Sequence, residues 1–338
     1  MKKINPIKST KKRVLTYLSR RPHRSFKKTL RRDYKRSLKL PGYMAFTKSV
    51  RQTLWANRRT FAALALTYAL ITVVMVGIAS QDNYLTLVNT LKSTSGDLFN
   101  GFWGNIGSAS LMSLTAITGG LSPTLTESQQ IYAVIIMILT WLTTVWLLRN
   151  VLAGHKVKLR DGLYNAGSPI LPTFLVVLLA VVQMLPLALA FIAYSAASVT
   201  GLLDNGIEAM LFWVADGLLA MLSVYWLSST FFALIIVTLP GMYPFQAIKT
   251  AGDLVVGRRL RLLFRFIWMA AGVLIIWGLV LIPTIIFDSW LKNVWAAASW
   301  VPIVPVVLLT ISSLTIIWVS SYTYLLYRKV IADDAGPA

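Results

Sequence analysis

The sequence contains no cysteine, and only two of its 338 residues are histidine. Disulfides, thiolate metal sites and cysteine nucleophiles are therefore excluded, and a histidine-based metal site is not expected. The chain also lacks a Walker A loop, an HExxH motif and a GxSxG motif. Neither nucleotide-driven transport by this chain alone nor zinc or serine hydrolase chemistry is supported. We expect a non-enzymatic protein with no catalytic residues, no cofactor and no bound metal.

Charged residues are scarce as well, at 13% of the chain against 56% hydrophobic residues. Soluble domains carry about 25% charged residues, so lipid must cover much of this chain. The formal net charge is nevertheless +21. Charge and apolarity are segregated along the sequence, because 20 of the 33 lysines and arginines lie between Lys2 and Arg59, where Asp33 is the only acid.

Six apolar runs are long enough to cross a bilayer, which takes about 20 helical residues. We therefore predict an all-α fold, a polytopic six-helix transmembrane bundle with amphipathic basic helices at its amino terminus. The predicted spans are residues 61–78, 131–148, 170–197, 210–238, 266–286 and 301–326, with Pro186 interrupting the third. They divide the chain into a basic arm (1–59), a membrane domain (60–328) and a short tail (329–338).

Basic residues alternate between successive loops. The segment before the first span, the loop of residues 149–160 and the loop of residues 249–265 are basic, whereas the intervening loops carry more acids than cations. Lysine and arginine near helix ends are retained on the cytoplasmic side, so both termini are predicted to be cytoplasmic. A mitochondrial presequence is the competing interpretation of the arm, which is basic and poor in acids.

The arm itself has helical periodicity. Phe26, Leu30, Tyr34 and Leu38 recur every fourth residue among cations, and a second such stripe, Tyr43, Phe46, Val50 and Leu54, follows the Pro41-Gly42 break. Helices of this kind lie at a membrane surface with the apolar face toward lipid. Three interpretations remain open: a solvated segment that only enforces orientation, binding of anionic lipid, and contact with nucleic acid or the ribosome.

The candidate anionic-lipid contacts are the cations of the arm and those just before the first and fifth spans. They are Lys27, Lys28, Arg31, Arg32, Lys35, Arg36, Arg58, Arg59, Arg258 and Arg259. The last four belong to a possible internal repeat. Phe46, Lys48, Leu54, Asn57, Arg58 and Arg59 match Phe245, Lys249, Leu254, Gly257, Arg258 and Arg259, the last four positions at a constant offset of 200 residues. Together with a looser echo before the third span, this suggests three copies of one unit: a short helix, a span out and a span back.

The segment from Tyr243 to Lys249, followed by Asp253 to Arg259 and an apolar span, resembles a broad group of six-span bacterial membrane proteins. That group includes the YciC-like inner-membrane proteins and the membrane domain joined to some glycerophosphodiester phosphodiesterases. The resemblance covers about 50 residues well and the six-span layout loosely, and the phosphodiesterase catalytic domain has no counterpart here. It implies a protein of the bacterial cytoplasmic membrane and transfers no catalytic residue.

Asp216 is the one acid placed inside a predicted span. A charge within a bilayer is costly and often functional, so Asp216, with Ser223 and Gln183, is the candidate intramembrane polar site. One interpretation is a proton or cation site in an outward-facing cavity. The other is an aspartate near a helix start, held by hydroxyls or water, or protonated because it is desolvated.

The outer segment 80–130 carries no charge between Leu98 and Thr126 and is too interrupted by Gly, Ser and Asn to span. It is interpreted as a lid or re-entrant piece over the six helices, or alternatively as an interfacial helix. Two functions follow from these features: a membrane-organising or assembly protein whose arm binds anionic lipid or a protein partner, or a permease or channel-like component for a small or lipidic solute that uses Asp216.

Overall fold

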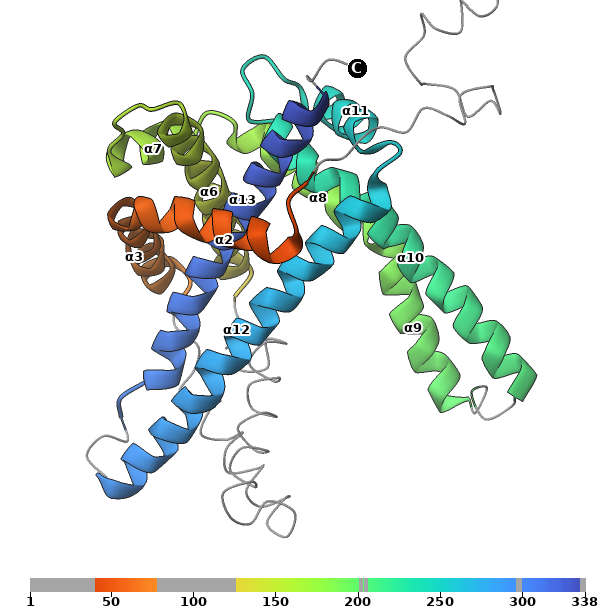
Figure 1. The fold of residues 1–338 in the computed structure, drawn as a ribbon. Helices are drawn as coiled ribbons and strands as arrows, with labels where there is room; N and C mark the ends of the chain where they lie inside the picture. The colour runs from red at the N-terminus through yellow and green to blue at the C-terminus, as the bar shows by residue number, and fades with distance from the viewer. Residues whose placement is uncertain (1–39, 78–125, 201–202, 204–205, 296–299, 335–338) are drawn as a thin grey trace, which may run out of the picture. The chain divides into compact units, whose positions relative to one another are not determined.

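The computed structural model describes residues 40–77, 126–200, 203, 206–295 and 300–334, and these ranges contain helices and no strand. The helices are α2 (Tyr43–Ala56), α3 (Arg58–Met75), α6 (Glu127–Leu152), α7 (Leu159–Ala166), α8 (Ile170–Gln183), α9 (Leu185–Val199), α10 (Gly206–Ile236), α11 (Pro244–Val255), α12 (Arg259–Val294) and α13 (Ile303–Asp334). Six of the helical segments are long and apolar enough to cross a membrane, with α8 and α9 counted together. The chain is therefore a multi-pass membrane protein, and the predicted all-α six-span bundle is confirmed (Figure 1).

Each odd-numbered span is preceded by a short helix. The order is α2, α3 and α6, then α7, α8 with α9, and α10, then α11, α12 and α13. This is the order of elements that the predicted repeat requires. We call the end of the bundle formed by the starts of α3, α8 and α12 and the ends of α6, α10 and α13 the collar end.

The residues matched in sequence do not occupy equivalent positions. Phe46 is buried, whereas Phe245 is 82% exposed, and α11 instead buries Ala247, Ala251 and Val255. Arg58 is exposed, whereas Arg258 is buried. The proposed alignment is therefore wrong in detail, because the side of each short helix that faces the bundle is set by packing and not by the matched letters.

The third span breaks where proline predicts it. Pro186 lies in the first turn of α9, and α8 ends at Gln183. In an unbroken helix the Leu187 amide would donate to the Gln183 carbonyl. Here it donates to the Ser223 hydroxyl of α10, 3.0 Å away. A neighbouring span thus supplies the acceptor for the amide that the helix break leaves free.

The fifth span is longer than its apolar run. It was expected over residues 266–286, but α12 has 36 residues and includes the charged residues on both sides of that run. At its far end Asp288, only 1% exposed, accepts from Lys292 at 2.8 Å. An ion pair one helical turn apart lets the helix continue through charges that were expected in a loop.

The main core lies toward the collar end. Its members come from α2, α3, α6, α8 and α10 to α13, and include Phe46, Leu64, Leu148, Phe232 and Tyr322. Arg149 of α6 joins the ends of two spans there, donating to the Thr238 carbonyl at 3.2 Å and to the Thr238 hydroxyl at 2.6 Å. Toward the other end α9 and α10 run side by side away from α12 (Figure 1), and their apolar side chains are largely exposed.

Candidate functional site

Part of the predicted site lies outside the described residues. This holds for the arm cations Lys27, Lys28, Arg31, Arg32, Lys35 and Arg36, and for residues 80–125 of the outer segment. The remaining five residues of that segment belong to the start of α6 or cap it: Thr126 accepts from the Gln129 amide at 3.4 Å, and the Gln129 side chain accepts from the Thr126 amide at 2.9 Å. The capping box explains why the second span begins at Glu127 and not at residue 131.

Gln183 and Ser223 both hold the break in the third span. The Thr230 hydroxyl of α10 donates to Gln183 Oε1 at 2.6 Å, and Ser223 accepts the freed Leu187 amide. Ser223 is fully buried. These two polar side chains are therefore used in packing α10 against α8 and α9.

Asp216 lies on the same face of α10 as Ser223 and Thr230, because the three are spaced seven residues apart. About two helical turns, roughly 10 Å, separate it from Ser223. Its Oδ1 is shielded from solvent and has no hydrogen-bond partner among the described residues. Since Gln183 and Ser223 are bonded elsewhere, the structure does not join the three predicted residues into one site.

The four predicted collar cations divide into two kinds. Arg258 is only 2% exposed, and Arg259 donates to the Tyr225 carbonyl at 3.1 Å with its guanidinium 3.9 Å from the Tyr225 ring centre. Arg58 and Arg59 are exposed, and the Arg58 guanidinium lies 5.4 Å from the Trp55 ring centre. The pair at α12 thus packs against the protein, while the pair at α3 is open to an outside ligand.

The apolar face of α2 is covered by protein. Phe46 meets Tyr322 of α13 edge to face, with ring centres 4.9 Å apart. Arg265 of α12 donates to the Pro41 carbonyl and stacks over the Tyr43 ring at 4.4 Å. The expectation that this stripe faces lipid is wrong, because the buried side of α2 is occupied by α12 and α13.

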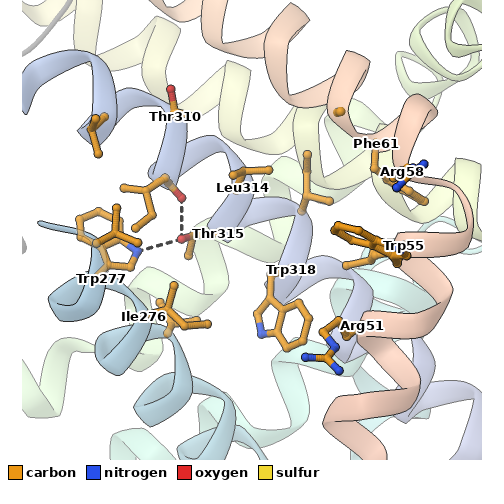
Figure 2. A pocket seen from close by; sticks show the side chains of 17 residues that line it. Arg51, Trp55, Arg58, Phe61, Ile276, Trp277, Thr310, Leu314, Thr315 and Trp318 are labelled. Atoms are coloured by element: carbon orange, nitrogen blue, oxygen red, sulfur yellow. Dashed lines mark hydrogen bonds between the residues drawn. The ribbon is translucent and has the colours of Figure 1, made fainter. Parts of the chain in front are cut away.

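A groove of about 540 Å³ lies between the α2–α3 pair and the α12–α13 pair. Figure 2 shows its lining, which is almost entirely apolar and includes Trp55, Phe61, Ile276, Trp277, Leu314 and Trp318. Ile276 and Leu314 are each about half exposed. The groove is therefore open along one side, where a membrane protein meets lipid.

Two arginines stand at one end of this groove. Figure 2 shows Arg51 and Arg58 on either side of Trp55, with Trp318 next to Arg51 and Trp277 at the opposite end. Neither arginine forms an ion pair with another described residue. A smaller adjoining hollow shares Arg51 and Trp55 and adds Gln52 and Ala56. The arrangement combines an apolar groove with a cationic end at Arg51 and Arg58, which we call the mouth of the groove.

Only part of this groove could be recognised from the sequence. Arg58 was a predicted lipid contact, and Arg51 stood beside the second apolar stripe. The tryptophans and threonines of α12 and α13 showed no distinguishing pattern, because apolar spans all look alike in composition. Residues more than 200 positions apart in sequence meet here only through folding.

Comparison of the chain with family models, with curated proteins and with solved structures finds no match.

Proposed function

We propose that this multi-pass protein belongs to the bacterial cytoplasmic membrane, has both termini in the cytoplasm, and binds anionic lipid at its collar end in an envelope-organising or assembly role. The observation that carries the proposal is a set of exposed cations on α2 and α3: Lys48, Arg51, Arg58 and Arg59. These two helices contain no acid at all.

The physical basis is electrostatic attraction to anionic headgroups. A cation near a membrane surface that carries anionic lipid contributes about 1 kcal/mol. The collar end, where the positive-inside rule expects the cytoplasm, is where α2 ends and α3 begins. The arm adds further cations before α2, so lipid attraction and orientation favour the same side. A protein partner or a second copy of the chain remains compatible with this role.

The test is the lipid composition that accompanies the purified protein. Protein extracted from native membrane should carry anionic phospholipid enriched over the bulk membrane, and a variant with Lys48, Arg51, Arg58 and Arg59 changed to Gln should lose most of that enrichment. Lipids at the bulk ratio in the unaltered protein would contradict the proposal.

A second function is favoured by one observation, the shielded and unpartnered Oδ1 of Asp216. A proton- or cation-coupled permease could use this carboxylate, because a charge within a span calls for a role or a partner. Asp216→Asn would then abolish solute flux into proteoliposomes while expression and folding persist. Unchanged flux in that variant removes this alternative.

A further inference from the structure

We infer that the groove between the α2–α3 pair and the α12–α13 pair holds one acyl chain of an anionic phospholipid, with the phosphate at the end of the groove where Arg51 and Arg58 lie. This inference rests on the proposed lipid-binding function and gives it a defined site. The ligand class follows from three features of the groove: its length, the state of its polar atoms and the charge at its mouth.

The groove is as long as one leaflet is thick. On α13 its lining runs from Trp318 to Val307, which is about 16 Å along a helix axis. Half of a typical hydrocarbon core is about 15 Å. On α13 this stretch begins in the middle of the helix and ends four residues from Ile303, and an extended acyl chain can lie along it.

The part of the groove away from the mouth offers no unsatisfied polar group to a ligand. Trp277 donates to the Thr315 hydroxyl at 2.9 Å, and Thr315 donates to the Ile311 carbonyl at 2.7 Å (Figure 2). Thr310 donates to the carbonyl of Val306 at 2.9 Å. Because these polar groups are already bonded within the protein, a hydrocarbon chain leaves none of them unsatisfied.

The positive charge at the mouth of the groove favours an anionic ligand. Arginine binds phosphate oxygens through its planar fork of donors, and two arginines near one end of the groove favour an anionic headgroup there. Trp318 adds an indole N–H that has no partner among the described residues. The cationic mouth thus matches the headgroup phosphate of a phospholipid, and the apolar lining of the groove matches its acyl chain.

Other occupants fit the mouth less well. A second copy of the chain would bring its own exposed collar cations against Arg51 and Arg58, and like charges repel across an interface. The residues that precede α2 are themselves strongly basic. α3 ends and α6 begins at the end of the bundle opposite the collar. An anionic lipid supplies the missing negative charge directly.

The experiment uses a photoactivatable phosphatidylglycerol with a diazirine near the end of one acyl chain. The full-length protein is reconstituted in nanodiscs that contain this probe, irradiated and digested, and the modified peptides are mapped by mass spectrometry. We expect adducts to concentrate on residues 273–280 and 307–318. A phosphatidylcholine probe with the same diazirine should modify these residues about thirtyfold less, as expected if the two arginines contribute about 1 kcal/mol each.

Two matched substitutions separate the groove from the general lipid surface. Leu314 lines the groove, and Leu274 of α12 does not; they are 48% and 54% exposed. Leu314→Trp should fill the groove and lower groove adducts about tenfold, since overpacking of this size carries a penalty of that order. Leu274→Trp should leave them unchanged. Ala62→Trp fills the groove from α3 and replaces Leu314→Trp if that variant fails to elute as a single folded species.

Each contrary outcome has a distinct meaning. Adducts that are spread evenly over all lipid-facing helices, or that neither filling variant lowers, contradict lipid binding in the groove. The proposed function still holds in that case if the co-purified lipid is enriched in anionic phospholipid. Equal groove labelling by the two probes overturns the headgroup assignment, whereas the proposed function is decided separately by the enrichment of anionic lipid in the purified protein. A second copy of the chain in the groove would exclude the probe, so an absence of adducts on these peptides overturns the inference.

Discussion

At the scale of single residues, the polar side chains within the spans hold helices together. Gln183, Ser223 and Arg149 each bond to a group on another span or its end, and each satisfies a polar atom that lipid could not. An unsatisfied backbone group in hydrocarbon costs several kcal/mol, so helix breaks in membranes need such partners. The break at Pro186 persists because α10 supplies one.

Removing the Ser223 hydroxyl should therefore weaken the fold. Ser223→Ala leaves the Leu187 amide without its acceptor, a loss of about 1–3 kcal/mol for a buried donor. Thermal unfolding of the purified protein in detergent would measure it. Ser229→Ala is the matched control, because that hydroxyl bonds only the Trp226 carbonyl of its own helix at 2.9 Å. Equal midpoints for the two variants would contradict the role given to Ser223.

Substitution of Asp216 should have the opposite effect on stability. Its shielded Oδ1 has no donor among the described residues, and a charged side chain within a span is costly. Asp216→Asn removes the charge at nearly constant shape, so the unfolding temperature should stay equal or rise. A marked fall would show that the carboxylate is bonded to a group the protein needs, and would contradict this account.

Residue types could be predicted from the sequence, but their partners could not. Asp216, Ser223 and Gln183 stand out because they are polar in apolar runs. Their grouping into one site failed, since Ser223 and Gln183 pair with Leu187 and Thr230. Periodicity places a residue on a face of its own helix, and only packing decides which helix covers that face.

At the scale of elements, α2 is a docked helix and not a free surface helix. Phe46 and Val50 are buried, and Trp268 of α12 donates to the Thr47 hydroxyl at 3.2 Å. Its cations remain exposed on the other side. Docking holds Arg51 and Trp55 in fixed positions at the mouth of the groove, which a freely moving amphipathic helix would not do.

Loss of the Phe46 ring should release α2. Phe46→Ala removes a buried aromatic, which costs about 3–5 kcal/mol in protein cores. Because the chain has no cysteine, Val50→Cys supplies the only thiol, buried beneath α2. A water-soluble maleimide should label it slowly in the otherwise unaltered protein and at least about tenfold faster with Phe46→Ala.

Met44 provides the control for this release, since it lies on the same helix and is 70% exposed. Met44→Ala should leave the labelling rate of Val50→Cys unchanged. Rapid labelling without any second substitution would mean that α2 is not docked in the membrane-embedded protein.

Helix boundaries show what an apolar run can and cannot indicate. The run predicts that a span exists, and all six spans are present. The apolar run stops at the first charged residues, whereas α12 continues through Arg265 and Asp288. Arg265 is buried against Pro41, and Asp288 is buried against Lys292. The helix ends depend on contacts made in three dimensions, so they differ from the sequence prediction by several residues.

At the scale of the whole molecule, the account requires the collar end to face the cytoplasm. Two exposed positions separate the sides: His155 lies in the loop between α6 and α7, and Trp300 lies between α12 and α13. In single-cysteine variants of intact cells, a membrane-impermeant maleimide should label Trp300→Cys and not His155→Cys. Both should react once the membrane is opened. The reverse pattern would place the cationic collar on the outside and contradict the proposed orientation.

The central claim is that the collar end selects anionic lipid through Arg51 and Arg58. Native mass spectrometry of the purified protein, titrated with phosphatidylglycerol or phosphatidylcholine, measures this selection for each bound lipid. The account predicts tighter binding of the first phosphatidylglycerol by about tenfold or more, at about 1 kcal/mol for each arginine, and loss of that preference in the Arg51→Gln, Arg58→Gln double variant. Arg160→Gln, a change of an exposed cation on α7, should retain it. Equal affinity for the two lipids, or a preference that survives the double substitution, would contradict the claim.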